Sequence, residues 1–284
     1  MIRRESEPGK NQAWAWDPSL YAGSAPYYPV GRVAYPPQLV AQLVEALPLD
    51  GTGVLLDVGC GPGSLTLLLA PHVAEAVGVD PDADMLEEAS RLARQHQVPN
   101  VTWRRLRGEE LPADLPRPDL VTFAQSFHWM DRPRVAAAVR RMLDANGAVV
   151  HVGATTHQGI DSDGPLPYPR PPSQAIDQLV QRFLGLERRA GRGVRDAVTF
   201  GADDDVYRAA GFEGPQRHQV PGRVVERTVE QVAASVYSLS YSAPHLFGDR
   251  LTAFDEQLRQ LLADASDEGR FAEHMQSITL SIWR

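Results

Sequence analysis

The feature that most constrains the fold is an alternation of short apolar runs and helical stretches over residues 54–152. The apolar runs predict strands at 54–58, 76–79, 101–106, 120–125 and 148–152, and the stretches between them predict helices at 64–70, 83–97 and 134–143. Strands that alternate with helices in this way form a parallel sheet with helices on its faces. The pattern therefore predicts the first five strands of a doubly wound α/β sheet.

The flanking segments extend this sheet. The remaining predicted elements are helices at 38–47, 173–189, 229–238 and 250–263, and extended pieces at 212–220 and 277–283, the candidate sixth and seventh strands. Residues 158–172 are dense in Gly, Pro and Asp, which is typical of a loop that leaves the sheet. We therefore expect a mostly parallel, seven-stranded sheet of the Rossmann-like kind with a helical insertion.

The chain length of 284 residues accommodates either one large domain with an insertion or two modest domains. The element order divides the chain into four parts. These are an N-terminal lid segment (1–37), a core (38–157), a helical insertion that forms a substrate cap (158–211), and a C-terminal part of the core with the last strands and added helices (212–284).

The charge of the chain argues against several partners. A net charge of −8 and a pI near 5.5 provide no positive field for a phosphate backbone, so we expect no nucleic-acid partner. Arg188, Arg189 and Arg192 form a short basic cluster that is typical of a solvated helix end. No apolar run approaches the roughly 20 residues that span a bilayer, and none follows Arg3 and Arg4 as in a secretory signal. We expect a cytoplasmic protein without a membrane partner.

Metal binding is not expected from the cysteine and histidine content. Cys60 is the one cysteine, which excludes an internal disulfide and a thiolate set for zinc. The eight histidines show no HExxH or comparable spacing with carboxylates. No metal site is therefore predicted.

The loop after the first strand carries the main functional signal. Gly59, Gly61 and Gly63 alternate directly after the apolar strand 54–58, and glycines there let the backbone turn sharply and approach a ligand closely. A dinucleotide loop has the spacing G-x-G-x-x-G and a P-loop ends in Lys-Ser or Lys-Thr, and neither fits. Asp57 precedes the loop and would repel a pyrophosphate, whereas it suits a cofactor with an ammonium and a sulfonium. The loop therefore favours S-adenosylmethionine (SAM).

A second acid lies at the end of the second strand. Asp80 follows the loop by about twenty residues, the position from which a carboxylate accepts hydrogen bonds from ribose hydroxyls. The alternative role for Asp80 is to cap the next helix, but Asp82 and Asp84 lie closer to the start of that helix and suit the capping role better. Asp80 is therefore the strongest ribose candidate.

Two stretches carry a family resemblance. The runs LLDVGCGPGSLTLLLA (55–70) and VGVDPDADML (77–86) resemble the class I SAM-dependent methyltransferases. The resemblance covers residues 28–152 well. It implies that the first acid and the glycines contact the methionine part, the second acid holds the ribose and an apolar residue packs on adenine. These roles and the matched stretches place the following residues at the cofactor: Asp57, Gly59, Cys60, Gly61, Gly63, Asp80, Pro81 and Met85.

Further family elements lie beyond these runs. After the third strand the family often has an acid that binds the adenine amino group, and the next backbone N–H meets a ring nitrogen. Arg107 and Gly108 occupy these positions; Arg107 departs from the acidic pattern, Gly108 retains its backbone N–H, and Glu109 is the nearest substitute carboxylate. Gln125 lies in AQSFHWMD (124–131), which resembles the small-molecule (type 11-like) branch of the family.

The N-terminal stretch YYPVGRVAYPP (27–37) resembles the lid of the same branch. In that lid, aromatic and Arg residues close over the methionine end of the cofactor. The resemblance therefore places Tyr28 at the cofactor and implies that Arg32 pairs with the methionine carboxylate.

Methyl transfer needs alignment, exclusion of water and, for a weakly acidic acceptor, removal of a proton. His128 is the candidate base, since an imidazole ordinarily titrates near neutral pH. The alternative is that His128 only bonds to the cofactor or to neighbouring backbone, as a carboxylate acceptor would need no base.

The expected function is methylation of a small molecule, with S-adenosylhomocysteine as the second product. Oxygen acceptors, either carboxyl or hydroxyl, are favoured, while nitrogen or carbon acceptors stay open. The segment after the fourth strand lacks the Asn/Asp-Pro-Pro-aromatic motif of DNA nitrogen methylation. A SAM-binding protein without methyl transfer is the alternative.

Overall fold

The central sheet has the topology that the sequence predicts. The computed structural model describes residues 16–185 and 202–284, and within them seven strands pair in the order β3-β2-β1-β4-β5-β9-β6. The strands are β1 (Val54–Val58), β2 (Glu75–Asp80), β3 (Val101–Arg105), β4 (Leu120–Ala124), β5 (Ala148–Gly153), β6 (Gln216–Val220) and β9 (Ile278–Trp283). β1 to β5 pair in parallel, and β9 is antiparallel to both β5 and β6. The doubly wound, mostly parallel fold is confirmed.

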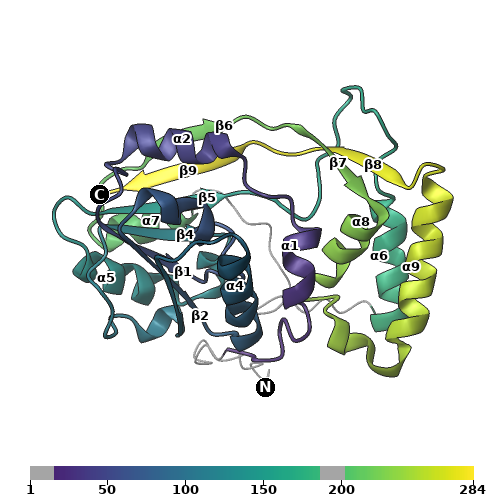
Figure 1. The fold of residues 1–284 in the computed structure, drawn as a ribbon, viewed down its shortest axis with the longest axis horizontal. Helices are drawn as coiled ribbons and strands as arrows, with labels where there is room; N and C mark the ends of the chain where they lie inside the picture. The colour runs from purple at the N-terminus through teal and green to yellow at the C-terminus, as the bar shows by residue number, and fades with distance from the viewer. Residues whose placement is uncertain (1–15, 186–201) are drawn as a thin grey trace, which may run out of the picture.

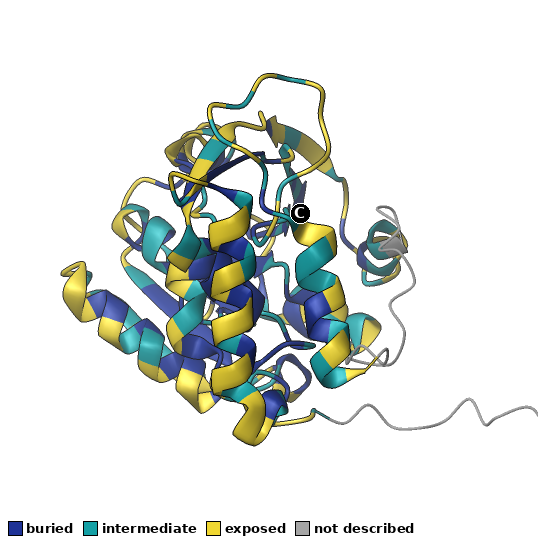
Figure 2. Ribbon diagram, turned by 90° about the vertical axis from the view of Figure 1, so that its right-hand side faces the viewer, coloured by how far each residue is buried: buried dark blue, intermediate teal, exposed yellow. Residues whose placement is uncertain are grey.

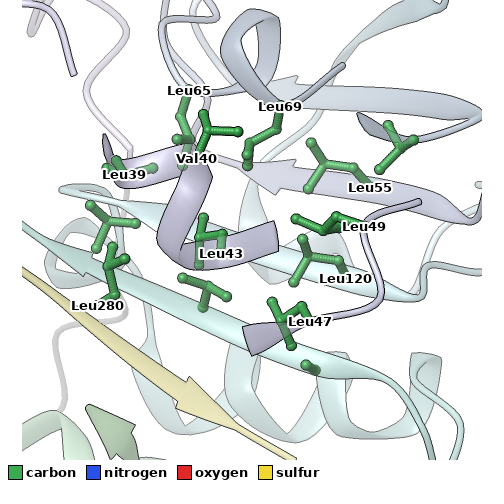
Figure 3. Close-up of a cluster of buried hydrophobic side chains, with 14 of the residues drawn as sticks. Leu39, Val40, Leu43, Leu47, Leu49, Leu55, Leu65, Leu69, Leu120 and Leu280 are labelled. Carbon is green, nitrogen blue, oxygen red and sulfur yellow. The ribbon is translucent and has the colours of Figure 1, made fainter. Parts of the chain in front are cut away.

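Helices cover the two faces of this sheet (Figure 1). The core helices are α2 (Pro37–Ala46), α3 (Thr66–Leu69), α4 (Ala83–Gln95), α5 (Arg132–Met142) and α7 (Ala202–Ala209). Leu39 and Leu43 of α2 lie with Leu55 of β1 and Leu120 of β4 in one buried cluster (Figure 3). Burial of each such leucine contributes roughly 1.5–3 kcal/mol, so this layer fixes α2 on the sheet.

A smaller cap lies beside the core. Its elements are α1 (Tyr28–Gly31), α6 (Ser173–Leu184), α8 (Val229–Tyr237), α9 (Leu251–Ala265), β7 (Val224–Thr228) and β8 (Arg270–His274). The rings of Phe247 and Phe254 stack at 4.0 Å between centroids in its interior. A Cβ at Gly31 would lie 2.3 Å from Ser235 N, so the absence of a side chain there lets α1 contact α8. Figure 2 shows the outer faces of the cap helices exposed and their inner faces buried.

The antiparallel pair β7 and β8 connects the cap to the core. The chain leaves β6 for β7 and returns from β8 to β9, so two extended paths run side by side between the two bodies (Figure 1). This pair is not predicted from the sequence. β7 and β8 are five residues each and mix charged with apolar residues, so their apolar alternation is weak.

The expected division of the chain differs from the structure at two places. α7 falls within the expected insertion 158–211, yet it packs on α5, and Tyr207 of α7 stacks on Trp283 of β9 at 5.1 Å. α8 and α9 fall within the expected 212–284 part of the core, yet they pack with α6. Both differences have the same cause. The period of a sequence shows which face of a helix is apolar, but the topology decides which element that face packs against.

Two element ends also differ from the prediction. The strand expected from 212 starts at Gln216, because Phe212 packs on the ring of Tyr207. The helix expected over 173–189 ends at Leu184, where Gly185 has φ +85° and ends the helix. The basic cluster at 188–192 lies outside the described residues. Within the described ranges, no helix is both long and apolar enough to cross a membrane.

Candidate cofactor-binding and active site

The glycine loop leaves β1 in a left-handed conformation at three positions. Gly59, Gly61 and Gly63 have φ values of +69°, +54° and +79°, which glycine adopts without strain. A Cβ at Gly59 would lie 2.5 Å from Ser126 Cβ, and one at Gly63 would lie 2.5 Å from the Trp103 ring. At Gly61 no heavy atom lies within 4 Å of such a Cβ. The loop is thus packed against the protein at both ends and opens at its centre.

Asp80 lies beside this opening at the end of β2. Its Oδ2 accepts a hydrogen bond from Gly61 N at 2.9 Å, and its Oδ1 accepts one from Asp82 N at 2.9 Å. Burial raises the pKa of the Asp80 carboxyl to about 6, although both backbone N–H groups act in the opposite direction. Asp82 caps α4 by accepting from the N–H groups of Asp84 and Met85, as the sequence predicts. Asp80 is therefore not needed as a cap.

Asp57 lies beneath the loop. Its Oδ1 accepts from the Thr122 hydroxyl at 2.7 Å, its Oδ2 accepts from the Thr66 hydroxyl at 2.6 Å, and the residue is 1% exposed. Burial raises the pKa of this carboxyl. These contacts connect β1 to β4 and to α3, so Asp57 positions the loop.

Cys60 fills the space under the loop. A Cβ at Gly78 would lie 2.9 Å from the Cys60 sulfur, and burial raises the pKa of the thiol well above its usual range. This supports the role of Cys60 as a small buried residue and argues against a reactive thiol. Met85 is buried in the first turn of α4, and the carbonyl of Pro81 accepts from Arg105 Nε at 3.1 Å.

The turn after β3 has Arg107 at the position where the family resemblance implies an acid. The Arg107 side chain is directed at Glu110, since Nε lies 3.1 Å from Glu110 Oε2. A Cβ at Gly108 would lie 2.7 Å from Met130 Sδ, so the turn packs closely on the segment after β4. Glu109 is 7% exposed; its Oε1 accepts from Asp131 N at 2.7 Å, and its Oε2 has no hydrogen-bond partner among the described residues. Glu109 therefore offers the buried acceptor that Arg107 does not.

The segment after β4 lies next to the loop. Gln125 has φ +58°, unusual for a residue with a side chain, and its Nε2 donates to Tyr35 Oη at 3.0 Å and to Thr156 Oγ1 at 3.4 Å. Ser126 Oγ donates to the Val58 carbonyl at 2.6 Å, which joins the ends of β1 and β4. The exposed His128 follows, with its ring 5.0 Å from that of Trp129. The strained turn thus presents His128 at the carboxyl edge of the sheet.

The N-terminal segment packs over the same edge. The Tyr21 ring contacts those of Trp129 and Tyr28 at centroid distances of 6.1 and 6.0 Å. The Arg32 guanidinium lies 4.6 Å from the Tyr28 ring, and its Nε donates to Ser238 Oγ at 2.8 Å. Arg32 Nη2 donates to the Ser238 carbonyl at 2.8 Å, so Arg32 faces the end of α8. The lid is therefore fastened to both the core and the cap.

Sequence reasoning missed some members of this group. Tyr21 and Tyr35 lie in the aromatic N-terminal stretch, where no period distinguishes a lid residue from a packing residue. Thr156 and Ser238 carry no motif at all. Among the described residues, no group of three His, Cys, Asp or Glu side chains is placed to hold a metal ion.

Comparison with known proteins decides the family. Residues 55–147 match a family described as a methyltransferase domain. An uncharacterized methyltransferase of Mycobacterium tuberculosis is 30% identical over 251 residues, which cover 87% of this chain and 87% of that protein. The chain belongs to the SAM-dependent methyltransferase family. Its cofactor is SAM, and the open position at Gly61 beside a buried carboxylate fits that cofactor.

One further relative agrees with this assignment, and two solved structures share the fold. A probable S-adenosylmethionine-dependent methyltransferase of Saccharomyces cerevisiae is 31% identical over 119 residues, 41% of this methyltransferase and 40% of its relative. The structure of a putative type II methyltransferase from Anaeromyxobacter dehalogenans is 22% identical in sequence, with a TM-score of 0.51. The match covers 88% of this chain and 95% of that structure's chain. The [4+2]-cyclase SpnF has 16% identity and a TM-score of 0.52, with coverage of 96% and 98%. These structures share the fold.

Proposed function

We propose that this methyltransferase transfers the methyl group to an oxygen atom of a small molecule, either a hydroxyl or a carboxyl group. The observation that carries the proposal is the position of the exposed His128 in the chain, two residues after Ser126, which packs on the glycine loop, and next to Trp129, which contacts Tyr21 of the N-terminal segment. A cap of this kind encloses one compact molecule. The net charge of −8 gives no reason to expect a polyanionic acceptor.

The proposed cofactor site uses the glycine loop, the acid at the end of β2 and the segments that flank them. The backbone of the loop around Gly61 approaches the methionine part, and the Asp80 carboxylate accepts from the ribose hydroxyls. Met85 and the turn at Gly108 border the adenine, with Glu109 as the acceptor there. Arg32 closes the methionine end together with the Tyr28 ring.

His128 accepts the acceptor's proton when that acceptor is a hydroxyl. Bound SAM would supply the methyl group from its sulfonium, with the electron pair of the carbon–sulfur bond kept by sulfur, and His128 would take the proton that the acceptor hydroxyl loses. Tyr21, Tyr28 and Trp129 exclude water from this edge, and Gln125 fixes the backbone that carries His128. A carboxylate acceptor uses the same site without the proton transfer.

The proposal is tested with SAM that carries a deuterated methyl group. The protein is incubated with fractions of a metabolite extract, and labelled products are sought by mass spectrometry. We expect a small labelled product, and brief treatment with mild alkali distinguishes a methyl ester, which hydrolyses, from a methyl ether, which does not. If calorimetry shows SAM binding but every fraction stays unlabelled, the protein binds SAM without transfer and the proposal is wrong.

The role of His128 is tested by His128→Ala. General-base catalysis contributes about 10²–10⁴-fold, so we expect kcat to fall by at least about 100-fold on a hydroxyl acceptor while SAM affinity stays unchanged. His96→Ala, at an exposed position beyond α4, is the matched control. Unchanged turnover in His128→Ala would show that His128 is not the base and that this segment contributes only to alignment of the acceptor.

A further inference from the structure

Three polar side chains from separate segments meet beside the glycine loop. Gln125 directly follows β4, Tyr35 lies just before α2, and Thr156 follows β5. Gln125 Nε2 donates to Tyr35 Oη at 3.0 Å and to Thr156 Oγ1 at 3.4 Å. Ser126, the next residue in the chain, packs so closely on the loop that a Cβ at Gly59 would lie 2.5 Å from its own Cβ. The three side chains therefore border the loop on the side of β4.

The amide of Gln125 determines what the two hydroxyl groups can bind. Its nitrogen has two hydrogens and donates one to each hydroxyl oxygen. Each hydroxyl thus accepts from the amide and keeps its own hydrogen for another partner. In the part of the chain that the structure describes, neither hydroxyl donates a hydrogen bond. Because both oxygens bond to one nitrogen, their hydrogens are close enough together to reach the two oxygens of one carboxylate.

The Tyr35 hydroxyl keeps its hydrogen at neutral pH. Burial raises its pKa to about 12, the Asp57 carboxylate acts in the same direction, and Gln125 and Arg32 act in the opposite one. The hydroxyl is therefore within electrostatic reach of both the acid beneath the loop and the guanidinium of the lid. The carboxylate of Asp57 already accepts from two threonine hydroxyls, whereas the charge of Arg32 favours an anion.

Gln125 adopts a backbone conformation that costs free energy. Its φ of +58° is left-handed, which residues with a Cβ rarely adopt. The segments around it are already joined without its side chain, because Val33 N donates to the Thr156 carbonyl at 2.7 Å. Strained residues cluster at ligand sites, where the strain holds a group in the required direction. Orientation of the two hydroxyls accounts for the strain, and a structural connection alone does not.

The strand order separates this cluster from the groups assigned to the cofactor. Asp80 ends β2 and the glycine loop follows β1, whereas Gln125 and Thr156 follow β4 and β5, the next two strands of the sheet. Neighbouring strands lie about 4.8 Å apart, so the end of β5 is roughly 10 Å from the end of β1. A ligand that contacts both hydroxyls therefore lies beside the loop, on the side away from the position of the ribose.

We propose that the hydroxyl groups of Tyr35 and Thr156 bind the carboxylate of the methyl acceptor. The inference rests on the proposed O-methylation and narrows its acceptor to a carboxylic acid. An ionised carboxylate has only acceptor oxygens, so it takes both hydrogens, whereas an alcohol brings a hydrogen of its own to oxygens that already accept from Gln125. In the transfer, a carboxylate oxygen would bond to the methyl carbon while sulfur keeps the electron pair of the broken carbon–sulfur bond. The product is a methyl ester, and no proton is transferred.

Two probes of similar shape test the preference for a carboxylate. Binding of benzoate and of benzyl alcohol to the full chain is measured by ligand-observed NMR in the presence of S-adenosylhomocysteine. Hydrogen bonds to a charged group are stronger than those to a neutral one, so we expect benzoate to bind at least about tenfold more tightly. Equal binding of the two probes, or tighter binding of benzyl alcohol, would overturn the proposal.

Removal of each hydroxyl tests the location. Tyr35→Phe and Thr156→Val keep the shape of the side chain, and we expect each to weaken benzoate binding about tenfold or more. Binding of S-adenosylhomocysteine should stay unchanged by calorimetry, which also shows that the variant is folded. Tyr168→Phe is the control, because it removes a hydroxyl that accepts from Arg270 in the cap. Unchanged benzoate binding in either folded variant would contradict the assignment.

Gln125→Glu distinguishes a donor pair from a structural connection. The new carboxylate accepts from both hydroxyls, so the three side chains stay connected but their hydrogens are no longer available to a ligand. We expect benzoate binding to be lost while Tm stays close to that of the wild-type protein. Retained benzoate binding would show that the hydroxyls only hold the segments together, and the proposal would be wrong.

The methionine part of the cofactor is a second source of a carboxylate. S-adenosylhomocysteine has this group and 5′-methylthioadenosine lacks it, so calorimetry with both compounds separates the two sources. If Tyr35→Phe and Thr156→Val weaken binding of S-adenosylhomocysteine tenfold and leave that of 5′-methylthioadenosine unchanged, the pair holds the cofactor and its assignment to the acceptor is wrong.

The O-methylation proposal fails in a different way. If benzoate binding depends on both hydroxyls but deuterated SAM labels no molecule in any fraction, the carboxylate site stands and methyl transfer to oxygen is wrong. If the labelled products are all ethers that resist mild alkali, O-methylation stands and the assignment of a carboxylic acid as acceptor is wrong.

Discussion

Lowering the pH from 7 to 5 is expected to weaken SAM binding through one carboxyl group. Asp80 accepts from Gly61 N and from Asp82 N, and we propose that it also accepts from the ribose hydroxyls. Burial raises the pKa of this carboxyl to about 6. Protonation turns one acceptor oxygen into a donor, so the neutral acid no longer serves all of these N–H and O–H groups.

The size of the effect follows from the pKa. With a pKa of about 6, roughly nine-tenths of the protein has an ionised Asp80 at pH 7 and roughly one-tenth at pH 5, so the apparent Kd for SAM rises about tenfold, or about 1.4 kcal/mol. Folding stability moves the opposite way. Because the folded pKa lies above the ordinary value of 3.8, the free protein binds more protons than the unfolded chain between pH 4 and 6. Asp80 therefore lowers the free energy of unfolding as the pH rises through this window, by up to about 3 kcal/mol.

Isothermal titration calorimetry with SAM at pH 5, 6, 7 and 8 measures the first effect, and urea unfolding of the free protein measures the second. Asp80→Asn should bind SAM weakly with little pH dependence between pH 5 and 7. Asp84→Asn, an exposed carboxyl nearby in the first turn of α4, should retain the wild-type profile. A constant Kd for wild-type protein across this range, or the same slope in Asp80→Asn, would refute the role given to Asp80.

Three further outcomes test packing. Gly59→Ala should lower Tm because its Cβ meets the segment after β4. Gly61→Ala should keep the fold, at a cost of about 1 kcal/mol for the left-handed φ, but lose most SAM affinity. An equal loss of Tm in both variants would contradict this. Arg227→Met leaves the Glu273 carboxylate buried without its cation, so urea unfolding should show a loss of about 3–5 kcal/mol, with partial recovery in the double variant with Glu273→Gln. Cys60 in the native protein should resist an aromatic disulfide reagent at pH 8, and labelling as fast as that of the unfolded chain would refute its burial.

The sequence was sufficient for the parts of the fold that depend on local pattern. Apolar period and chain order predicted the parallel strands, and alternating glycines predicted a sharp turn after β1, where the structure places Gly61 beside Asp80. The packing of α8 and α9 against α6 depends on contacts between residues far apart in the chain, which no window of sequence contains. For the same reason the sequence does not identify the role of Arg227, because one of its partners, Gly31, lies 196 residues earlier in the chain.

At the candidate site, the sequence predicts the residue types, and the structure adds the partners of each side chain. The prediction places Asp57 at the methionine end, and the structure adds that two threonine hydroxyls from other elements hold its carboxylate. Arg32 was expected to pair with a carboxylate of the cofactor, and the structure turns its Nε and Nη2 to Ser238. Side-chain direction is set by tertiary neighbours, so a motif gives the position of a group without its partners.

The discontinuity of the cap limits how the cap can change between relatives. Its helices come from three separate stretches of the chain, with α1 before the core, α6 after β5, and α8 with α9 between β7 and β8. Arg227 joins the carbonyl of Gly31 to that of Gln231, so residues from two of these stretches share one side chain. A cap of this construction cannot be exchanged between relatives as a single cassette. Under the proposed function, new acceptor preference would instead arise by individual substitutions on the inward-facing sides of the cap helices, each compatible with a frame that the rest of the chain already fixes.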